Sequence, residues 1–468
     1  MPISSYNCFN EILPLPEKII PADGMFELNC PLEVVAPASC VFQVDRLKKA
    51  MAFLDLDCGT GTRKFRLEED AALAPDGWRI TVAPREITLE ASNRAGMTYA
   101  AAALIQMLAV ATTAGKGRFL TMTCGTAEAV PRFAWRGFML DCARHFRSRE
   151  TILKLLRVMA HFRYNVFHWH LTDNEGWRTP SRICPALAGK GELQDGSYSR
   201  DDIAAIAEAA EALDIRIVPE FDLPGHSRRL IRALPGMGCT GGAGDEICIG
   251  SRSVREKIGE LLDEFMGLFP ASTEIHLGGD ESDPGHWEAC PDCRKALRER
   301  GMDSIRELEH EFVLSLIRQV RSSGRRAVVW NDAGIYPPEV IVQIWVEKNR
   351  METLKNGNQV ILSPCSRCYT DRLFDWELKF ADFQDCLGVQ DNYLYDPCTG
   401  HEDFRSQIMG TECCAWGEYL PERRLLNKIL PRLTALAEVC CGDPRQKVWT
   451  AFVKRDARQR DAGCESVW

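Results

Sequence analysis

The chain has 468 residues, of which 45% are hydrophobic and 26% are charged, and its formal net charge is −9. This composition is typical of soluble globular proteins and excludes a disordered or fibrous chain. No basic stripe stands out among the 57 basic and 66 acidic residues. We therefore expect neither nucleic acid nor a membrane surface as a partner, because both bind to clustered Lys and Arg.

Residues 1–130 are predicted to form a smaller α+β domain. Segments with strand composition lie at 26–35, 64–67, 78–82 and 87–90, and an alanine-rich helical stretch follows at 98–110. The uncharged run 95–115 has the length of a membrane span, but it is rich in alanine and threonine, which transfer poorly into lipid. We interpret this run as a helix packed inside the protein.

From residue 131 onward, short apolar runs alternate with amphipathic helical stretches. Helices are predicted at 149–163, 200–213 and 304–323, and the second begins with a capping box formed by Ser199 and Asp202. The apolar runs, which we interpret as strands, lie at 137–140, 166–171, 215–221, 274–277, 327–330, 340–345, 360–362 and 408–416. Eight strands alternating with helices predict an α/β fold, a (β/α)₈ TIM barrel over residues 131–468.

Carboxylates and large aromatic side chains follow nearly every predicted barrel strand. The active site of such a barrel lies at the carboxyl ends of its strands, so these side chains are expected to converge there. Three strands end in a tryptophan, at Trp330, Trp345 and Trp416. Aromatic rings stack on the apolar faces of sugars, and carboxylates and arginine bind sugar hydroxyl groups, so the pattern favours a carbohydrate ligand.

The sharpest local feature is the pair Asp280-Glu281, which follows an apolar strand and two glycines, Gly278 and Gly279. Adjacent side chains on a regular strand point to opposite faces. The glycines allow the backbone to leave the strand, so that both carboxylates can turn into one pocket. Two neighbouring acids also shift their pKa values apart, which can leave one ionised and the other able to donate a proton.

With these motifs in place, the sequence resembles the family-20 glycoside hydrolases, the β-N-acetylhexosaminidases. Segment 276–281, His-Leu-Gly-Gly-Asp-Glu, looks like the signature of that family, and segments 136–146, 165–173, 219–226 and 416–418 fit it in the same order. Residues 96–108 resemble the end of its N-terminal domain. The resemblance implies an exo-acting, retaining enzyme that removes terminal β-linked N-acetylglucosamine or N-acetylgalactosamine. In such an enzyme the substrate's own acetamido group forms an oxazolinium intermediate.

The resemblance also implies a role for each matching residue. Asp280 would orient the acetamide and stabilise the oxazolinium, and Glu281 would act as general acid and then as general base. Arg144 would hold the 3- and 4-hydroxyl groups in a planar fork. The other implied positions are Trp330, Trp345 and Trp416 as walls, Tyr369 on the acetamide carbonyl, Asp371 and Glu418 on the 4- and 6-hydroxyl groups, and Asp173 and His226 as residues that orient the catalytic acids.

Two other functions remain open on the sequence alone. A metal-dependent hydrolase on the same barrel could assemble a zinc site from His168, His170, Asp222, His226 and His276. A glycan-binding protein or structural scaffold without turnover is the second alternative, although the intact acidic pair argues against it. The oligomeric state, with a homodimer among the options, the natural glycan and the gluco- or galacto-preference also stay open.

The 20 cysteines include two C-x-x-C pairs, Cys290/Cys293 and Cys365/Cys368, and neither lies in the spacing of a zinc ribbon. Because free cysteine is among the most buried residue types, we interpret the cysteines as reduced, buried or loop thiols, and we expect no metal and no cofactor. The first ten residues show no signal-peptide pattern. On that ground we expect a cytoplasmic protein, or a secreted one if the sequence has been trimmed.

Overall fold

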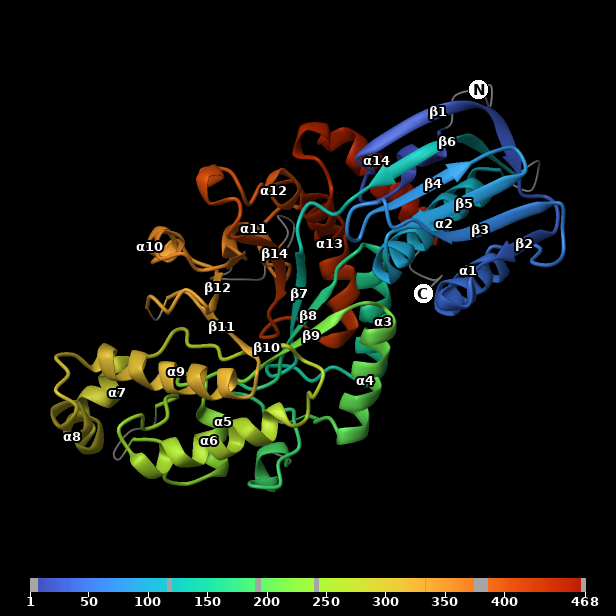
Figure 1. Ribbon diagram of the computed structural model, residues 1–468. Coiled ribbons are helices and arrows are strands. Elements are labelled where there is room, and N and C mark those ends of the chain that lie inside the picture. The colour runs from blue at the N-terminus through green and yellow to red at the C-terminus, as the bar shows by residue number, and fades with distance from the viewer. Residues whose placement is uncertain are drawn as a thin grey trace.

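The computed structural model describes residues 7–115, 120–189, 195–239, 244–332, 334–373 and 386–463. It contains two units that lie side by side, a twisted six-stranded sheet with its helices and a closed eight-stranded barrel (Figure 1). The fold predicted from the sequence, a (β/α)₈ barrel preceded by a smaller α+β domain, is confirmed.

The N-terminal sheet has the strand order β1-β6-β4-β5-β3-β2. The pairs β1/β6, β6/β4 and β4/β5 are antiparallel, whereas β5/β3 and β3/β2 are parallel. The strands are β1 (Lys18–Glu27), β2 (Leu32–Val35), β3 (Arg63–Glu69), β4 (Trp78–Val82), β5 (Glu86–Ala91) and β6 (Thr121–Ala129).

In this domain one predicted strand is wrong, and two observed strands were largely or entirely missed. The predicted strand 26–35 is wrong, because the end of β1, a break and β2 occupy these residues. Most of β1 and all of β6 had no predicted counterpart. β1 contains Pro21 and Gly24, and almost all of its side chains are exposed, so it lacks the alternation of apolar and polar residues by which a half-buried strand is recognised.

The long helix α2 (Arg94–Gly115) packs against β4, β5 and β6, and α1 (Val41–Phe53) packs against α2. Within the described residues, α2 is the one helix whose length and composition would suit a membrane span, over Arg94–Thr113, but 89% of its apolar window is buried inside the protein. The interpretation of run 95–115 as an internal helix is therefore confirmed.

The barrel strands are all parallel, and β14 pairs with β7 to close the circle. They are β7 (Trp135–Asp141), β8 (Val166–His170), β9 (Arg216–Glu220), β10 (Glu274–His276), β11 (Arg326–Trp330), β12 (Ile341–Ile344), β13 (Val360–Leu362) and β14 (Ile408–Ala415). Each one overlaps one of the eight predicted apolar runs, because a strand buried on both faces has an almost continuously apolar sequence.

Helices surround the barrel and fill its connections. The longer ones are α3 (Arg149–His161), α4 (Arg200–Ala212), α6 (Arg252–Met266), α9 (Ile305–Ser322), α13 (Leu425–Cys441) and α14 (Trp449–Asp461). The shorter ones are α5 (Arg228–Ala233), α7 (Pro284–Ala289), α8 (Pro291–Glu299), α10 (Arg350–Lys355), α11 (Cys365–Cys368) and α12 (Val389–Leu394). The predicted capping box is present at the start of α4, where the backbone N–H of Asp202 donates to Ser199 Oγ and that of Ser199 donates to Asp202 Oδ2, both at 3.0 Å.

The barrel interior is layered along the strands. Near their amino ends lies an apolar cluster of Trp135, Val166, Val218, Val328, Ile341 and Ile361. Because side chains two residues apart share a face, the next inward layer is formed by His168, Glu220, Trp330, Gln343 and Glu412. These side chains are buried and hydrogen-bonded, for example Trp330 Nε1 to Glu220 Oε1 and Gln343 Nε2 to Glu412 Oε1, both at 2.9 Å. This polar layer forms the floor under the carboxyl ends of the strands.

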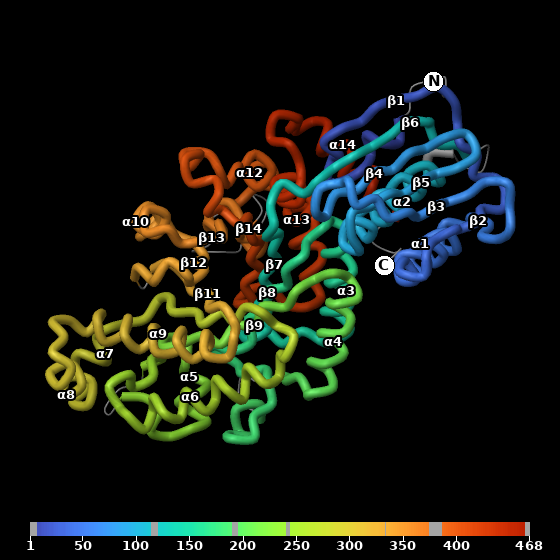
Figure 2. Tube along the Cα trace, in the orientation of Figure 1, coloured from blue at the N-terminus to red at the C-terminus, as the bar shows by residue number. Residues whose placement is uncertain are grey.

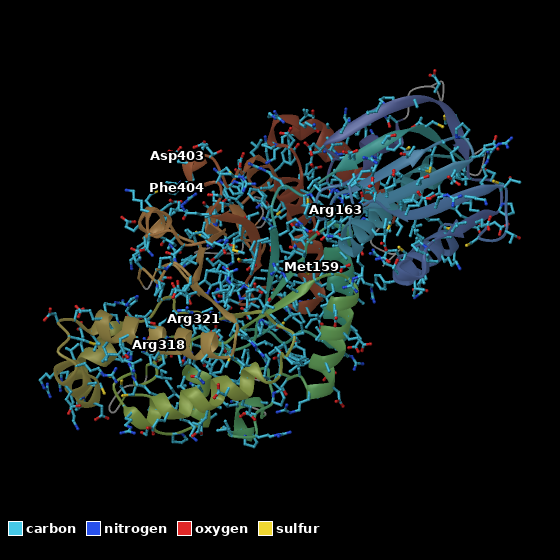
Figure 3. All side chains as sticks on the ribbon, viewed as in Figure 1. Met159, Arg163, Arg318, Arg321, Asp403 and Phe404 are labelled. Atoms are coloured by element: carbon cyan, nitrogen blue, oxygen red, sulfur yellow. The ribbon has the colours of Figure 1, made fainter. Side chains whose placement is uncertain are left out.

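The two units are tied together by specific contacts. Arg163, labelled in Figure 3, lies at their junction, where its Nη1 donates to the carbonyl of Pro14 at 2.8 Å and its guanidinium lies 4.8 Å from the ring centroid of Trp78. The helix α14 returns to the N-terminal domain (Figure 2) and packs against α2, and Gln459 Nε2 donates to the carbonyl of Glu11 at 2.6 Å. The sheet ends at Ala129 and the barrel begins at Trp135. A division into separate domains at residue 130 stays a prediction.

Candidate active site

A pocket of about 290 Å³ lies at the carboxyl ends of the barrel strands. Ten of the eleven residues that the sequence pointed to line it, namely Arg144, His226, Asp280, Glu281, Trp330, Trp345, Tyr369, Asp371, Trp416 and Glu418. The eleventh, Asp173, is buried beside the pocket and contacts both Arg144 and His226. Residues far apart in the sequence, from Arg144 to Glu418, therefore meet at one place.

The glycines before the acidic pair shape the turn. Gly278 and Gly279 have φ values of +66° and +95°, a left-handed conformation that side chains disfavour. A Cβ on Gly278 would lie 1.6 Å from Asp222 Oδ1, so no larger residue fits there. Beyond this turn, Glu281 also has a positive φ of 51°, and its backbone N–H donates to Asp332 Oδ2 at 3.0 Å. Both carboxylates of the pair line the pocket.

Asp280 and Glu281 experience different environments. Asp280 is buried, and burial together with nearby carboxylates raises its pKa to about 7, against the opposing effect of His226. Its Oδ1 has no hydrogen-bond partner among the described residues, whereas Oδ2 lies 3.7 Å from His226 Nε2. The side chain of Glu281 is 58% exposed, and its Oε2 also lies 3.7 Å from His226 Nε2. One carboxylate is thus held inside the pocket with a free oxygen, and the other lies at its mouth.

A chain of buried ion pairs runs behind these acids. Arg144 Nη1 lies 2.8 Å from Asp173 Oδ2 and 3.2 Å from Asp141 Oδ2, and His226 Nδ1 lies 3.1 Å from Asp173 Oδ1. Burial by itself would raise the pKa of Asp173, but Arg144 and His226 lower it far below the ordinary range. The pKa of His226 is raised well above its usual value, because Asp173 and other carboxylates outweigh its burial. His226 therefore connects the Asp173–Arg144 pair to both acids of the pocket.

Aromatic side chains that follow β11–β14 form the opposite wall. The ring centroid of Trp416 lies 6.0 Å from that of Trp330 and 6.1 Å from that of Tyr369. Trp345 is oriented by its indole N–H, which donates to Asp332 Oδ1 at 3.1 Å, and the backbone N–H of Trp416 donates to Asp371 Oδ1 at 3.2 Å. Burial raises the pKa of Asp371 to about 6. Flat apolar surfaces with polar groups at their rim suit a sugar ring.

Four residues at the site were not among the predicted site residues. Asp332 joins the backbone of Glu281 to the indole of Trp345, and Glu220 supports Trp330 from below. The alternation of side chains along a strand could have revealed both, because Asp332 lies two residues after inward-facing Trp330 and Glu220 lies two residues after inward-facing Val218. Arg372 and Tyr419 also line the pocket. They lie in loops, where no strand periodicity reveals the direction of a side chain.

The histidines considered for a zinc site are engaged by carboxylates. His170 lies between Glu220 and Asp173, with 2.7 Å from its Nε2 to Asp173 Oδ2. His276 Nδ1 lies 2.9 Å from Glu220 Oε1, and His168 Nδ1 lies 2.7 Å from Glu412 Oε1. These pairs fix the imidazole rings beneath the pocket.

Comparison with known proteins identifies the family. The family model described as glycosyl hydrolase family 20, catalytic domain, matches residues 133–442, and the one described as domain 2 of the same family matches residues 10–128. The chain belongs to glycosyl hydrolase family 20. The resemblance noted in the sequence is therefore confirmed, and the enzyme is a glycoside hydrolase of the β-N-acetylhexosaminidase type.

Relatives from several bacteria agree with this assignment. A β-hexosaminidase from Vibrio furnissii is 29% identical in an alignment that covers 91% of this chain and 76% of that protein. One from Akkermansia muciniphila is 29% identical, with 84% and 85% covered. The structure of an exo β-N-acetylglucosaminidase from Vibrio harveyi in complex with N-acetylglucosamine superposes with a TM-score of 0.86 at 25% identity, over 100% of this chain and 79% of that one. A β-N-acetylhexosaminidase from Bacteroides fragilis gives 0.83 at 27%, over 97% and 96%.

These matches decide between the functions that the sequence left open. The substrate of this family-20 hydrolase is a glycan with a terminal N-acetylhexosamine. The family and its named relatives are β-hexosaminidases, which favours a glycoside hydrolase over the metal-dependent barrel hydrolase and over the glycan-binding protein without turnover.

Proposed function

We propose that the enzyme removes single β-linked N-acetylhexosamine residues from the non-reducing ends of glycans, with retention of configuration, through an oxazolinium intermediate. The observation that carries this proposal is the buried Asp280 with its unpartnered Oδ1, next to Glu281 in an aromatic pocket. The pocket volume of about 290 Å³ is near the lower end of ligand sites, about 300–1,000 Å³. This size suits one sugar residue better than a long glycan chain.

In the first step, the carbonyl oxygen of the substrate's acetamido group attacks the anomeric carbon, and the bond from that carbon to the leaving oxygen breaks. Glu281 gives its proton to the leaving oxygen. Asp280, in its ionised form, accepts the acetamide N–H and then faces the positive charge of the oxazolinium ring. Trp330, Trp345 and Trp416 surround the acetamide, and Tyr369 donates to its carbonyl oxygen.

In the second step, the ionised Glu281 takes a proton from a water molecule, and the resulting hydroxide-like oxygen attacks the anomeric carbon and opens the oxazolinium ring. Two attacks from opposite faces restore the original configuration. The exposure of Glu281 supports this double role, because at the mouth of the pocket its carboxylate is accessible both to the leaving oxygen and to a water molecule.

The sugar hydroxyl groups are assigned to the charged residues of the pocket. Arg144 is held by Asp141 and Asp173, so its guanidinium plane has a fixed direction and can contact the 3- and 4-hydroxyl groups. Glu418 and Asp371 line the same pocket and are assigned to the 4- and 6-hydroxyl groups.

The first test is dependence on the acetamido group. We expect hydrolysis of aryl N-acetylglucosaminide or N-acetylgalactosaminide, no comparable turnover of the plain glucoside, and strong inhibition by a thiazoline mimic of the intermediate. Proton NMR should show the β-anomer as the first product. Equal turnover of the plain glucoside would contradict the mechanism, and an α-anomer as first product would exclude retention.

The second test separates the two acids by a leaving-group series. Glu281→Gln should lower kcat/KM by about 10²–10⁴-fold on natural glycosides, the usual contribution of acid–base catalysis, and much less on an aryl glycoside with an acidic phenol. Asp280→Asn should have a similar penalty on both, because it acts on the attack that both substrates share. The opposite pattern would mean that the roles of the two carboxylates are exchanged.

A cytoplasmic location and a homodimer stay predictions. Cell fractionation tests the first, and light scattering coupled to size-exclusion chromatography tests the second.

A further inference from the structure

Four cysteines meet at the edge of the barrel away from the N-terminal domain. Cys239 and Cys248 lie between α5 and α6, where a β-bridge between Gly238 and Ile247 brings them side by side. Cys290 precedes α8 and Cys293 lies in its first turn, in the part of the chain that extends outward as α7 and α8 (Figure 1). The exposed fractions of the four residues are 9%, 2%, 1% and 0% in chain order.

The sulfur atoms of these residues have the spacing of a tetrahedral metal site. Cys248 Sγ lies 3.7 Å from Cys290 Sγ and 3.8 Å from Cys293 Sγ, and Cys239 Sγ lies 3.9 Å from Cys293 Sγ. All four sulfurs lie within 4.8 Å of one another. A zinc ion with bonds of about 2.3 Å to four sulfurs in tetrahedral geometry separates them by about 3.8 Å. A disulfide would instead place two sulfurs about 2.05 Å apart.

The surrounding backbone favours thiolates at this place. The backbone N–H of Ser251 donates to the carbonyl of Cys248 at 3.2 Å, which fixes the turn that leads from Cys248 into α6. Ser251 caps the fifteen-residue helix α6 and Cys290 caps α8, so Cys248, Cys290 and Cys293 lie near the positive ends of helix dipoles. A Cβ on Gly250 would lie 2.4 Å from Cys293 Cα, so only glycine allows this close approach.

We propose that Cys239, Cys248, Cys290 and Cys293 bind one zinc ion as a structural four-thiolate site. Zinc binds thiolates in closed tetrahedral sites of this kind, and such a site contributes to the free energy of folding. In the sequence, Cys290 and Cys293 stand as an isolated C-x-x-C pair. The two other cysteines, Cys239 and Cys248, lie 42 to 54 residues earlier, in another loop of the barrel. Their own spacing does not match the C-x-x-C pattern of zinc ligands.

The site joins the two loops that carry His226 and Glu281 of the active-site pocket. The loop after β9 contains His226 and continues to Cys248, and the loop after β10 contains Glu281 and continues into α7 and α8. Polar contacts already link them, since Glu246 Oε1 accepts from the backbone N–H of Asp283 at 3.2 Å and Trp287 Nε1 donates to the carbonyl of Ile247 at 2.8 Å. Zinc would add a rigid link between the same segments and keep the relative positions of His226 and Glu281 fixed.

The test is the metal content of the full-length enzyme, purified without a metal-affinity tag. We expect inductively coupled plasma mass spectrometry to find about one zinc ion per chain. A mercurial reagent should release this zinc in proportion to the number of thiols that it blocks. Cobalt(II) exchanged into the site should give the intense visible bands of tetrahedral thiolate coordination. Cys293→Ser should lose the zinc and lower the Tm by several degrees. Cys239→His, which offers another zinc ligand at the most exposed position, should retain it.

The matched control is Cys124→Ser, which removes a buried thiol in the N-terminal domain, on β6, and should keep the zinc. Three results would overturn the proposal: wild-type enzyme without zinc and with four reactive thiols at these positions, disulfides between them, or iron in place of zinc. Retention of a full zinc equivalent in Cys293→Ser would overturn it as well. The measurement on the wild-type enzyme is decisive even if a variant fails to fold.

Discussion

The side of the pocket built by β7–β10 holds a continuous network of ion pairs, whereas the side built by β11–β14 supplies the large aromatic residues, with Asp371 and Glu418 at their rim. On the charged side, Asp173 contacts Arg144, His226 and His170 within 3.1 Å. On the aromatic side, Trp330 and Trp345 are each anchored by one indole N–H to a carboxylate. A buried charge without its partner is costly, while an aromatic wall loses only part of its contacts when it is trimmed. Substitutions on the charged side should therefore have larger effects.

The largest effect should follow the removal of the charge at the centre of the ion pairs. Asp173→Asn leaves Arg144 and His226 without their shared carboxylate, and breaking a buried pair costs about 3–5 kcal/mol. We expect kcat/KM to fall by about 10²–10³-fold. The pKa of His226 should also fall, since Asp173 raises it more than any other carboxylate does.

The pH profile of kcat/KM checks this prediction, because a merely structural defect would not move the pKa of His226. Asp201→Asn, on the exposed surface of α4, serves as the control and should behave like the wild type. A profile for Asp173→Asn that matches the wild type would show that the ion pairs do not set the electrostatics of the pocket.

Arg144→Lys should have the next largest effect. A planar guanidinium that contacts two hydroxyl groups while bound to Asp141 and Asp173 cannot be replaced by a point ammonium. We expect a loss of about 2–4 kcal/mol in transition-state binding, as for other buried charged contacts, measured as kcat/KM with an aryl substrate. A variant within a few-fold of the wild type would mean that Arg144 does not contact the sugar.

A third prediction concerns stability rather than rate. The pKa of Asp280 is raised to about 7 in the folded enzyme, above a value of about 3.9 for an unfolded aspartate. Its protonated form is therefore favoured by folding, and this stability is present below about pH 4 and lost as pH rises toward 7. Asp280→Asn should raise the free energy of unfolding by about 1–3 kcal/mol at pH 8 and by little at pH 4. Thermal unfolding across this range checks it, and an equal effect at both pH values would exclude titration of Asp280 as the cause.

The smallest effect should come from the aromatic side. Trp345→Phe keeps an apolar face but loses the indole hydrogen bond to Asp332, worth about 1 kcal/mol. We expect kcat/KM to fall by less than about tenfold, mainly through KM. A loss as large as that of Arg144→Lys would remove the contrast between the two sides, and would point to Asp332 and its contact with Glu281 as the reason.

The sequence alone determined the barrel and most of the pocket, because both depend on local patterns. A strand buried on both faces needs a short apolar run, and all eight runs became barrel strands. The parity of side chains along a strand places Val328, Trp330 and Asp332 in successive inward layers, and the glycines before Asp280 predict the turn that brings the acids into the pocket. These features need only a few neighbouring residues to specify them.

Only the tertiary structure decided which carboxyl groups have raised pKa values, which residues support the pocket and which cysteines lie close together. The pKa of Asp280 is raised by burial and by charged groups that come from several strands. Asp332 links Glu281 to Trp345, which lies on another connection of the barrel. The four clustered cysteines come from two loops that no spacing rule connects. Burial, pKa and metal geometry depend on groups far apart in the chain, so a pattern read within a short window cannot contain them.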